Sequence, residues 1–293
     1  MAAASTGSTV LAAEGFFPRL RLAPRSAIPG FGLGFGITLA WLSLLVLIPL
    51  AALVARPWEL GVAGVLGVVT EPRVMAALRL SFGAALLAAA IDLPGGLLTA
   101  WVITRYRFPG RRLLDGMVDL PFALPTAVAG IALTALYAPN GWLGALVEPL
   151  GLKLAFGPAG IVIALAFVGL PFIVRTVEPV LRDLSPAAEE AAATLGATRL
   201  QTVTRVVLPQ LAPALLTGFA LAFARAVGEY GSVIFIAGNM PMVSEIAPLL
   251  ITVRLEQFDY AGAAAIGLAM LVIAFLLLSL LGLLHRHIRW ARL

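Results

Sequence analysis

The chain has 293 residues, of which 61% are hydrophobic and 12% are charged. Soluble globular domains are about 45–50% apolar and about 25% charged, so this composition excludes an ordinary soluble fold. The net charge of +5 does not indicate nucleic-acid binding, because the arginines stand in short clusters beside hydrophobic runs and form no basic stripe. The sequence contains no cysteine, which excludes disulfides.

Six apolar runs are long enough to cross a bilayer. A transmembrane helix needs about 20 predominantly apolar residues, and the candidate spans are residues 31–54, 75–104, 120–138, 158–174, 212–237 and 261–284. The runs are too long and too continuous for barrel strands, and lipid tolerates only helices or closed barrels. We therefore predict an all-α membrane protein with six transmembrane helices in contact with lipid.

The candidate spans divide the chain into three parts. Residues 1–30 form an N-terminal cytoplasmic segment, residues 31–287 the transmembrane domain, and residues 288–293 a cytoplasmic tail. A cleaved signal peptide has a shorter apolar core followed by a small-residue cleavage site. The first span is long and ends in Ala-Arg-Pro-Trp, so we expect it to be retained.

The distribution of basic residues predicts the orientation. If the N-terminus lies in the cytoplasm, the outer segments hold few basic residues, which are Arg56, Arg73, Arg79, Lys153 and Arg254. Most of the 20 basic residues then fall on the cytoplasmic side, as the positive-inside rule requires. We therefore predict that both termini are cytoplasmic, which also fits an even number of spans.

Prolines interrupt two of the candidate spans. Asp92 closely precedes Pro94 in the second span, where a proline breaks the hydrogen-bond ladder and an aspartate can cap the restarted helix. We favour this structural role over an ion site, although any charge inside a span is a functional candidate. Pro121 and Pro125 are expected to kink the third span, as a fixed bend or as a gate hinge.

The segment at residues 185–209, between the fourth and fifth spans, carries helix start and stop signals. Ser185 is a good N-cap with Pro186 at the first helical position, and Glu189 suits the dipole of that end. Gly196 can adopt the left-handed conformation that ends a helix, and the threonine two residues later can cap another. We predict a short helix, a sharp turn and a second short helix.

The same segment resembles the signature loop of ABC importer permeases. The pattern is Glu-Ala-Ala, then a glycine, an aliphatic residue and Leu-Pro, and the matching residues are Glu190, Ala191, Ala192, Gly196, Val206, Leu208 and Pro209. The resemblance implies that these residues, with Glu189, dock into a groove on a separate ATPase subunit. An amphipathic connector and a helix-turn-helix DNA reader are the alternatives, but the full spacing and the lack of a soluble domain favour coupling.

The chain lacks the motif needed to hydrolyse ATP by a P-loop. That motif requires a Gly-Lys pair, and the only lysine, Lys153, follows a leucine. We expect a separate ATPase subunit to use ATP and magnesium, with no cofactor bound by this chain.

Four further blocks resemble the T-type permease of sulfate/thiosulfate importers. They lie at residues 104–110, 119–130, 171–179 and 228–239. The resemblance implies a type I ABC importer permease fold in a bacterial inner membrane, and sulfate and thiosulfate as substrates. It also implies as partners a W-type permease or a second copy of this chain, an ATPase and a periplasmic binding protein. Molybdate or tungstate is the alternative substrate. Sulfate and molybdate are both tetrahedral dianions, and the molybdate permeases share part of the last block.

Two charges fall four residues apart in the fifth span. Arg225 and Glu229 would share one helix face. They could line the translocation pathway, with the arginine attracting a divalent anion and the glutamate keeping it from lodging there. They could equally be a self-neutralising pair that supports packing, and the sequence leaves both readings open.

The outer segment at residues 240–260 predicts an amphipathic helix, with Glu245 on its polar face. We expect it to pack over the bundle, and expect the binding protein to contact its polar face and residues 140–157. His285 and His287 are interpreted as interfacial anchors and not as metal ligands. No catalytic constellation is found, which argues against a membrane enzyme, and the lack of an internal repeat argues against a self-contained carrier.

Overall fold

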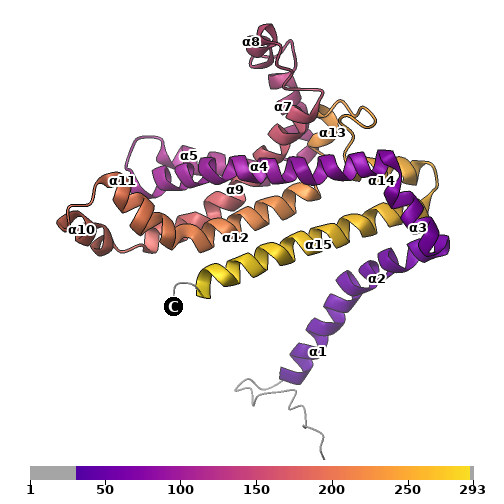
Figure 1. The fold of residues 1–293 in the computed structure, drawn as a ribbon, viewed down its shortest axis with the longest axis horizontal. Coiled ribbons are helices and arrows are strands. Elements are labelled where there is room, and N and C mark those ends of the chain that lie inside the picture. The colour runs from indigo at the N-terminus through magenta and orange to yellow at the C-terminus, as the bar shows by residue number, and fades with distance from the viewer. Residues whose placement is uncertain (1–30, 291–293) are drawn as a thin grey trace, which may run out of the picture. The chain divides into compact units, whose positions relative to one another are not determined.

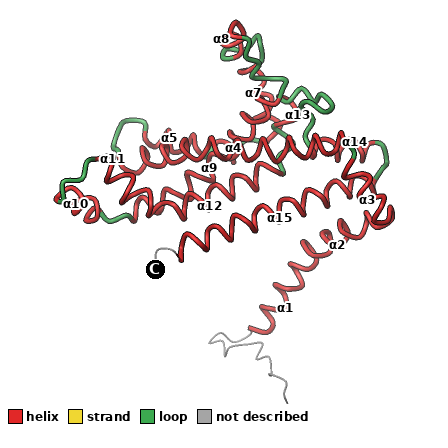
Figure 2. The backbone as a smooth tube through the Cα atoms, in the orientation of Figure 1, coloured by secondary structure: helices red, strands yellow, loops and turns green. Residues whose placement is uncertain are grey.

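The computed structural model describes residues 31–290, with side chains described as far as residue 283. The expected N-terminal segment at 1–30, the end of the tail at 291–293 and the side chains of His285 and His287 lie outside this description. Every regular element within the described residues is a helix (Figures 1 and 2). The predicted all-α fold is therefore confirmed.

The chain divides into two compact units, the first ending at Leu50 and the second starting at Ala51. In the first unit, α1 (Phe31–Leu42) continues through a π-helical turn, η1 (Ser43–Leu47), into α2 (Ile48–Ala55), which crosses the boundary. None of the side chains of α1 is buried by the chain itself. Lipid accepts such apolar side chains, which agrees with the expected first span.

The second unit contains the remaining helices. In chain order they are η2 (Arg56–Leu60), α3 (Gly61–Thr70), α4 (Pro72–Arg105), α5 (Arg111–Val118), α6 (Leu120–Ala123), α7 (Thr126–Tyr137), α8 (Gly144–Val147), η3 (Glu148–Leu150), α9 (Pro158–Asp183), α10 (Pro186–Thr194), α11 (Arg199–Thr202), η4 (Val203–Val207), α12 (Leu208–Val227), α13 (Val233–Ile236), α14 (Ala247–Glu256) and α15 (Tyr260–Trp290).

Helices α4, α9 and α12 lie side by side and form the core, with α15 beside α12 (Figure 1). Small residues allow the close approach. A Cβ added at Gly96 of α4 would lie 2.7 Å from Ile173 Cγ2, and one added at Gly218 of α12 would lie 3.0 Å from Ile173 Cα. Glycines from two neighbouring helices thus pack closely against α9 at Ile173, and such packing at small residues is common in membranes.

Five helical segments among the described residues are long and apolar enough to span a membrane. They correspond to the first, second, fourth, fifth and sixth expected spans. The third expected span, residues 120–138, corresponds to the two helices α6 and α7, of which α7 is a shorter apolar helix. The chain breaks at Leu124 and Pro125, both with extended backbone, because proline disfavours a helical residue before it.

Two predicted details of the spans are wrong. The second span is not interrupted at Asp92 and Pro94, because α4 is continuous across both residues, so Asp92 caps no helix. Neighbouring helices let membrane helices tolerate proline. The fifth span does not continue to residue 237, because α12 ends at Val227 and α13 starts at Val233.

Helix α14 packs over the bundle as expected. Ile246 and Leu250 are buried, and α14 lies against α4 and α15. Glu245 is not on an exposed polar face, which corrects the prediction, since it is buried and receives two hydrogen bonds of 2.7 Å from Arg73. The buried charge is tolerated because this arginine binds it through both carboxylate oxygens.

Candidate functional site

The segment at residues 185–209, called the coupling segment after its expected role, folds into the predicted helix, turn and helix. Ser185 Oγ accepts a hydrogen bond from the Ala187 amide at 3.3 Å, with Pro186 at the first position of α10. Gly196 takes the left-handed conformation with φ of +80°. Thr198 and Gln201 form a reciprocal capping box at the start of α11, so local sequence signals determine this turn.

The tip of the coupling segment is uncovered and partly apolar. Leu195 is 88% exposed and Leu200 is 73% exposed, while Ala191 is exposed and Ala192 half-buried. Glu190 is exposed and has no partner among the described residues. The segment passes through the π-helical turn η4 into α12, where Leu208 and Pro209 are half-buried. This surface offers a partner small side chains, two leucines and one free carboxylate.

An ion pair ties the coupling segment to the end of α4. Arg105 Nη2 donates to Glu189 Oε1 at 2.6 Å, and the Arg105 guanidinium lies 5.5 Å from the centre of the Trp101 ring. Arg105 stands in the block at residues 104–110 that resembles sulfate permeases, and no role was predicted for it. The opposite charges were the available signal, but their 84-residue separation gave no reason to pair them.

A second charge cluster joins α9 to the start of the third expected span. Arg175 donates to Asp115 at 2.7 Å, to Asp119 at 2.9 and 2.7 Å, and to Glu178 at 2.7 Å. Glu178 is buried and also pairs with Arg182. No role was predicted for these residues, although Asp119 stands in the block at residues 119–130 and Arg175 and Glu178 stand in the block at 171–179.

Arg225 and Glu229 are brought together, but not on one helix. Glu229 lies beyond the end of α12 and is 3% exposed. Its Oε2 lies 2.6 Å from Arg225 Nη1, and its Oε1 accepts hydrogen bonds from the amide and hydroxyl of Ser232 at 3.0 and 2.9 Å. The Arg225 side chain remains 37% exposed. Ser232, which donates two hydrogen bonds to the buried carboxylate, was not predicted as a site residue.

The loop that carries Glu229 packs directly on α7. A Cβ added at Gly130 would lie 2.4 Å from the Ser232 carbonyl oxygen, and one added at Gly231 would lie 2.2 Å from Thr126 Oγ1. Two blocks that were quoted separately, at 119–130 and 228–239, thus meet in space. At Gly130 the backbone of Ser232 leaves no room for a side chain, and at Gly231 the side chain of Thr126 fills that space.

Asp92 lies apart from this cluster, enclosed in the core of α4, α9 and α12. It is 5% exposed, and its Oδ2 has no hydrogen-bond partner. A Cβ added at Gly169 of α9 would lie 2.5 Å from that oxygen. Neither an ion pair nor a hydrogen bond joins Asp92 to Arg225 or Glu229 within residues 31–283.

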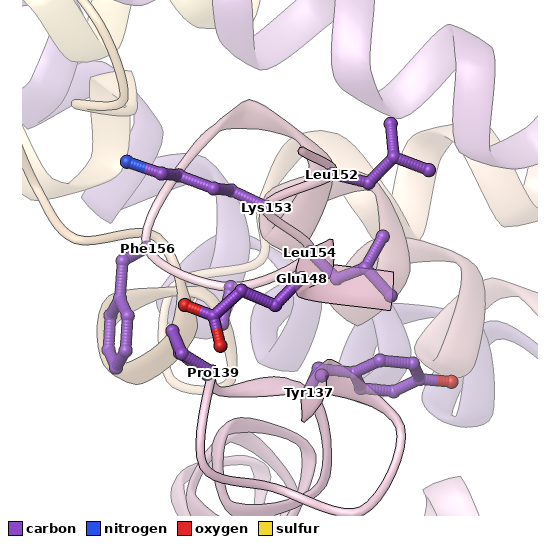
Figure 3. A pocket seen from close by; sticks show the side chains of 9 residues that line it. Tyr137, Pro139, Glu148, Leu152, Lys153, Leu154 and Phe156 are labelled. Atoms are coloured by element: carbon purple, nitrogen blue, oxygen red, sulfur yellow. The ribbon is translucent and has the colours of Figure 1, made fainter. Parts of the chain in front are cut away.

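The connection between α7 and α9 encloses a pocket of about 170 Å³ (Figure 3). Tyr137, Glu148, Lys153 and Phe156 line it, together with small and aliphatic residues. Lys153 and Glu148 extend from the same connection without forming an ion pair (Figure 3). The pocket lies in the region where the sequence analysis expected the binding protein. No group of three His, Cys, Asp or Glu residues suited to a metal occurs in the described part of the chain.

The chain matches, over residues 92–290, the family described as "Binding-protein-dependent transport system inner membrane component". The chain belongs to this family. Relatives of this transport component include the "Sulfate transport system permease protein CysT" of Salmonella typhimurium, which is 49% identical over 88% of this chain and 94% of the relative. The protein of the same name from Escherichia coli is 48% identical over 87% and 92%, and that from Synechocystis is 46% identical over 87% and 88%.

Solved structures support the fold of this transport component. A chain from the crystal structure of a bacterial alginate ABC transporter, in complex with an alginate pentasaccharide-bound periplasmic protein, superposes with a TM-score of 0.72. It is 19% identical and the match covers 88% of this chain and 94% of that one. At this identity the likeness shows the ABC importer permease fold alone.

Proposed function

We propose that this chain is a permease subunit of a bacterial ATP-driven importer that moves sulfate, with thiosulfate as a second substrate, across the inner membrane. The observation that carries the proposal is the 46–49% identity to sulfate permeases over 87–88% of this chain. As a member of its family the chain is a transport component and not an enzyme.

In this proposal the coupling segment contacts an ATPase subunit that binds ATP and magnesium. The exposed Leu195 and Leu200 would enter its groove, and the free carboxylate of Glu190 would meet a donor there. A movement of α10 caused by the ATPase would then be transmitted to the helix bundle through two connections. One is the Arg105–Glu189 ion pair to α4, and the other is the direct continuation of η4 into α12.

The remaining partners follow from the same proposal. A W-type permease or a second copy of this chain supplies the other half of the pathway, and a periplasmic sulfate-binding protein delivers the substrate. Both termini are cytoplasmic, which places α10 and α11 on the side of the ATPase. The arginine distribution supports this orientation.

We assign the anion pathway to Arg225 and Glu229. Arg225 pairs with Glu229 through Nη1, and more than a third of its side chain is exposed, so the guanidinium group, which has five N–H donors, can also face a dianion. Glu229 accepts from Ser232 as well, which holds Arg225 in position and limits how tightly the anion binds. Asp92 would join the pathway only if α4 and α9 separated, since it is enclosed between them.

Uptake of labelled sulfate tests the proposed function. The chain and its partner subunits are expressed in a host that lacks its own sulfate permease, with excess thiosulfate or molybdate as competitor. Uptake blocked by thiosulfate and little affected by molybdate supports the sulfate assignment. Background sulfate uptake with accumulation of molybdate would overturn the substrate and keep the importer, and transport of neither anion would contradict both.

A further inference from the structure

A group of unpaired arginines stands where α4 leads into α5. Arg107, Arg111 and Arg112 form no ion pair and no hydrogen bond with any described side chain. With Phe108 and Gly110 they line an open hollow of about 340 Å³. Other arginines near this end of the bundle are paired with carboxylates, namely Arg105, Arg175 and Arg182. The three free guanidinium groups therefore present a concentrated positive charge without a partner in the described chain.

An apolar ridge on α5 and the start of α6 begins next to these arginines. Leu113, Met117 and Leu120 recur at helical spacing, and all three are exposed, Leu113 by 70%. The opposite side of α5 faces the protein, where Val118 is buried and Asp115 is held by Arg175. The ridge is thus fixed in an outward direction. It leads into the third expected span, so it lies at the edge of the apolar layer.

We propose that the hollow and the ridge together bind an anionic phospholipid. The phosphate would lie among Arg107, Arg111 and Arg112, where guanidinium donors form charge-assisted hydrogen bonds with phosphate oxygens. One acyl chain would lie along the ridge of Leu113, Met117 and Leu120. Free phosphate or sulfate could use the arginines but not the ridge. Basic groups at the end of a membrane span beside apolar side chains match both parts of a lipid.

The site also gives the lipid a structural role. Because α5 and the residue that follows it are joined to α9 through Asp115 and Asp119 on Arg175, a lipid seated on α5 braces the contact between the third and fourth spans. Each basic side chain near a membrane surface contributes about a fivefold gain in affinity. Loss of all three arginines should weaken binding about 100-fold by the same measure.

Lipid binding to the purified importer complex tests this site. The complex is prepared in detergent, and dioleoylphosphatidylglycerol, dioleoylphosphatidylcholine or inorganic phosphate is added. Native mass spectrometry counts bound lipid, and thermal unfolding reports stabilisation. The triple variant Arg107→Gln, Arg111→Gln, Arg112→Gln is compared with the control Arg79→Gln, which removes an exposed arginine of α4 that lies outside the hollow.

Wild type and the control should retain phosphatidylglycerol and gain several degrees of thermal stability from it, with no gain from phosphatidylcholine or phosphate. The triple variant should lose both effects. Leu113→Ser with Met117→Ser should weaken lipid retention while leaving the arginines in place, and single Arg112→Gln gives a partial loss if the triple variant does not fold. Equal lipid retention in the triple variant would overturn the proposal. Stabilisation by phosphate alone would also overturn it, as would loss of ATPase co-purification with unchanged lipid binding.

Discussion

At the residue scale, the buried carboxylate of Glu229 depends on one ion pair and two hydrogen bonds. Arg225 supplies the ion pair, and its replacement by glutamine leaves a carboxylate that is 3% exposed without its cation. Breaking a buried ion pair by removing one partner costs about 3–5 kcal/mol. We predict that Arg225→Gln lowers labelled sulfate uptake below about a tenth of the wild-type level, and that Arg225→Lys restores part of it, because lysine keeps the charge but not the planar donor group.

Uptake in this experiment is normalised to the amount of protein in the membrane. The control is Arg79→Gln on α4, an exposed arginine without an ion pair among the described residues. If both Arg225→Gln and Glu229→Gln transport at the wild-type rate, the pair does not belong to the pathway and serves packing only.

The contact between α7 and the Glu229 loop gives a second prediction at this scale. Gly130→Ala places a Cβ 2.4 Å from the carbonyl oxygen of Ser232, a backbone atom that cannot rotate away. Overpacking of this kind costs about 1–3 kcal/mol, so the variant should unfold at lower temperature. Gly83→Ala is the matched control, because nothing lies within 4 Å of its added Cβ and alanine favours a helix interior. Equal melting temperatures for the two variants would show that α7 and the Glu229 loop can move apart without loss of stability.

At the element scale, the coupling segment folds through its own helix caps, and its leucines Leu195 and Leu200 are exposed. Glu190→Ala and the double change Leu195→Ser, Leu200→Ser leave the caps of α10 and α11 untouched. We predict that both variants abolish transport and weaken co-purification of the ATPase, with normal membrane levels of this chain. Glu256→Ala, which changes an exposed glutamate at the end of α14, is the control for ATPase co-purification. Full ATPase retention in both coupling variants would remove the docking role.

The junction of α14 and α15 makes stability depend on pH. The side chain of Asp259 accepts a hydrogen bond from the Gly262 amide at 2.9 Å and another from Arg254 at 2.8 Å. The Gly262 bond, and then Arg254, lower the pKa of Asp259 below its usual value. A lowered folded-state pKa stabilises the fold above the unfolded pKa of about 3.9, and this contribution is lost as the pH falls through the folded value.

Asp259→Asn can still cap α15 but cannot titrate. We predict that it melts below the wild type at pH 6, and that the difference in melting temperature shrinks as the pH is lowered below about 4. Thermal unfolding in detergent at a series of pH values measures this difference. A gap that stays constant across the series would show that the charge of Asp259 contributes nothing.

At the scale of the whole molecule, the sequence predicted what is decided locally. The apolar runs located the spans, and Ser185, Gly196 and Thr198 set the coupling turn, because each acts on its own neighbours in the chain. The continuity of α4 through Pro94 and the end of α12 at Val227 could not be predicted in this way. Both depend on contacts with other helices, as do the pairs Arg105–Glu189 and Arg175–Asp119, whose partners are far apart in sequence.

The two routes from α10 into the bundle give a prediction for the molecule as a whole. If the Arg105–Glu189 pair transmits movement, Arg105→Gln and Glu189→Gln should each reduce the sulfate-stimulated ATP hydrolysis of the assembled importer. The double variant should be no worse than either single one, because contacting residues are non-additive. Hydrolysis is measured with binding protein present. Fully additive losses would mean that the two residues act separately.

Gly96 and Gly218 pack closely on Ile173, so α4, α9 and α12 are expected to move together as a rigid unit. A 20-residue helix such as α12 is about 30 Å long, so a tilt of about 10° applied at the coupling end would swing the opposite end by about 5 Å, given that helix length. Helix α12 ends at Val227, with Gly228 as its C-cap. The displacement of this end therefore moves the short loop that carries Glu229. A small stroke at one surface thus becomes a displacement comparable to the diameter of a small anion at the other.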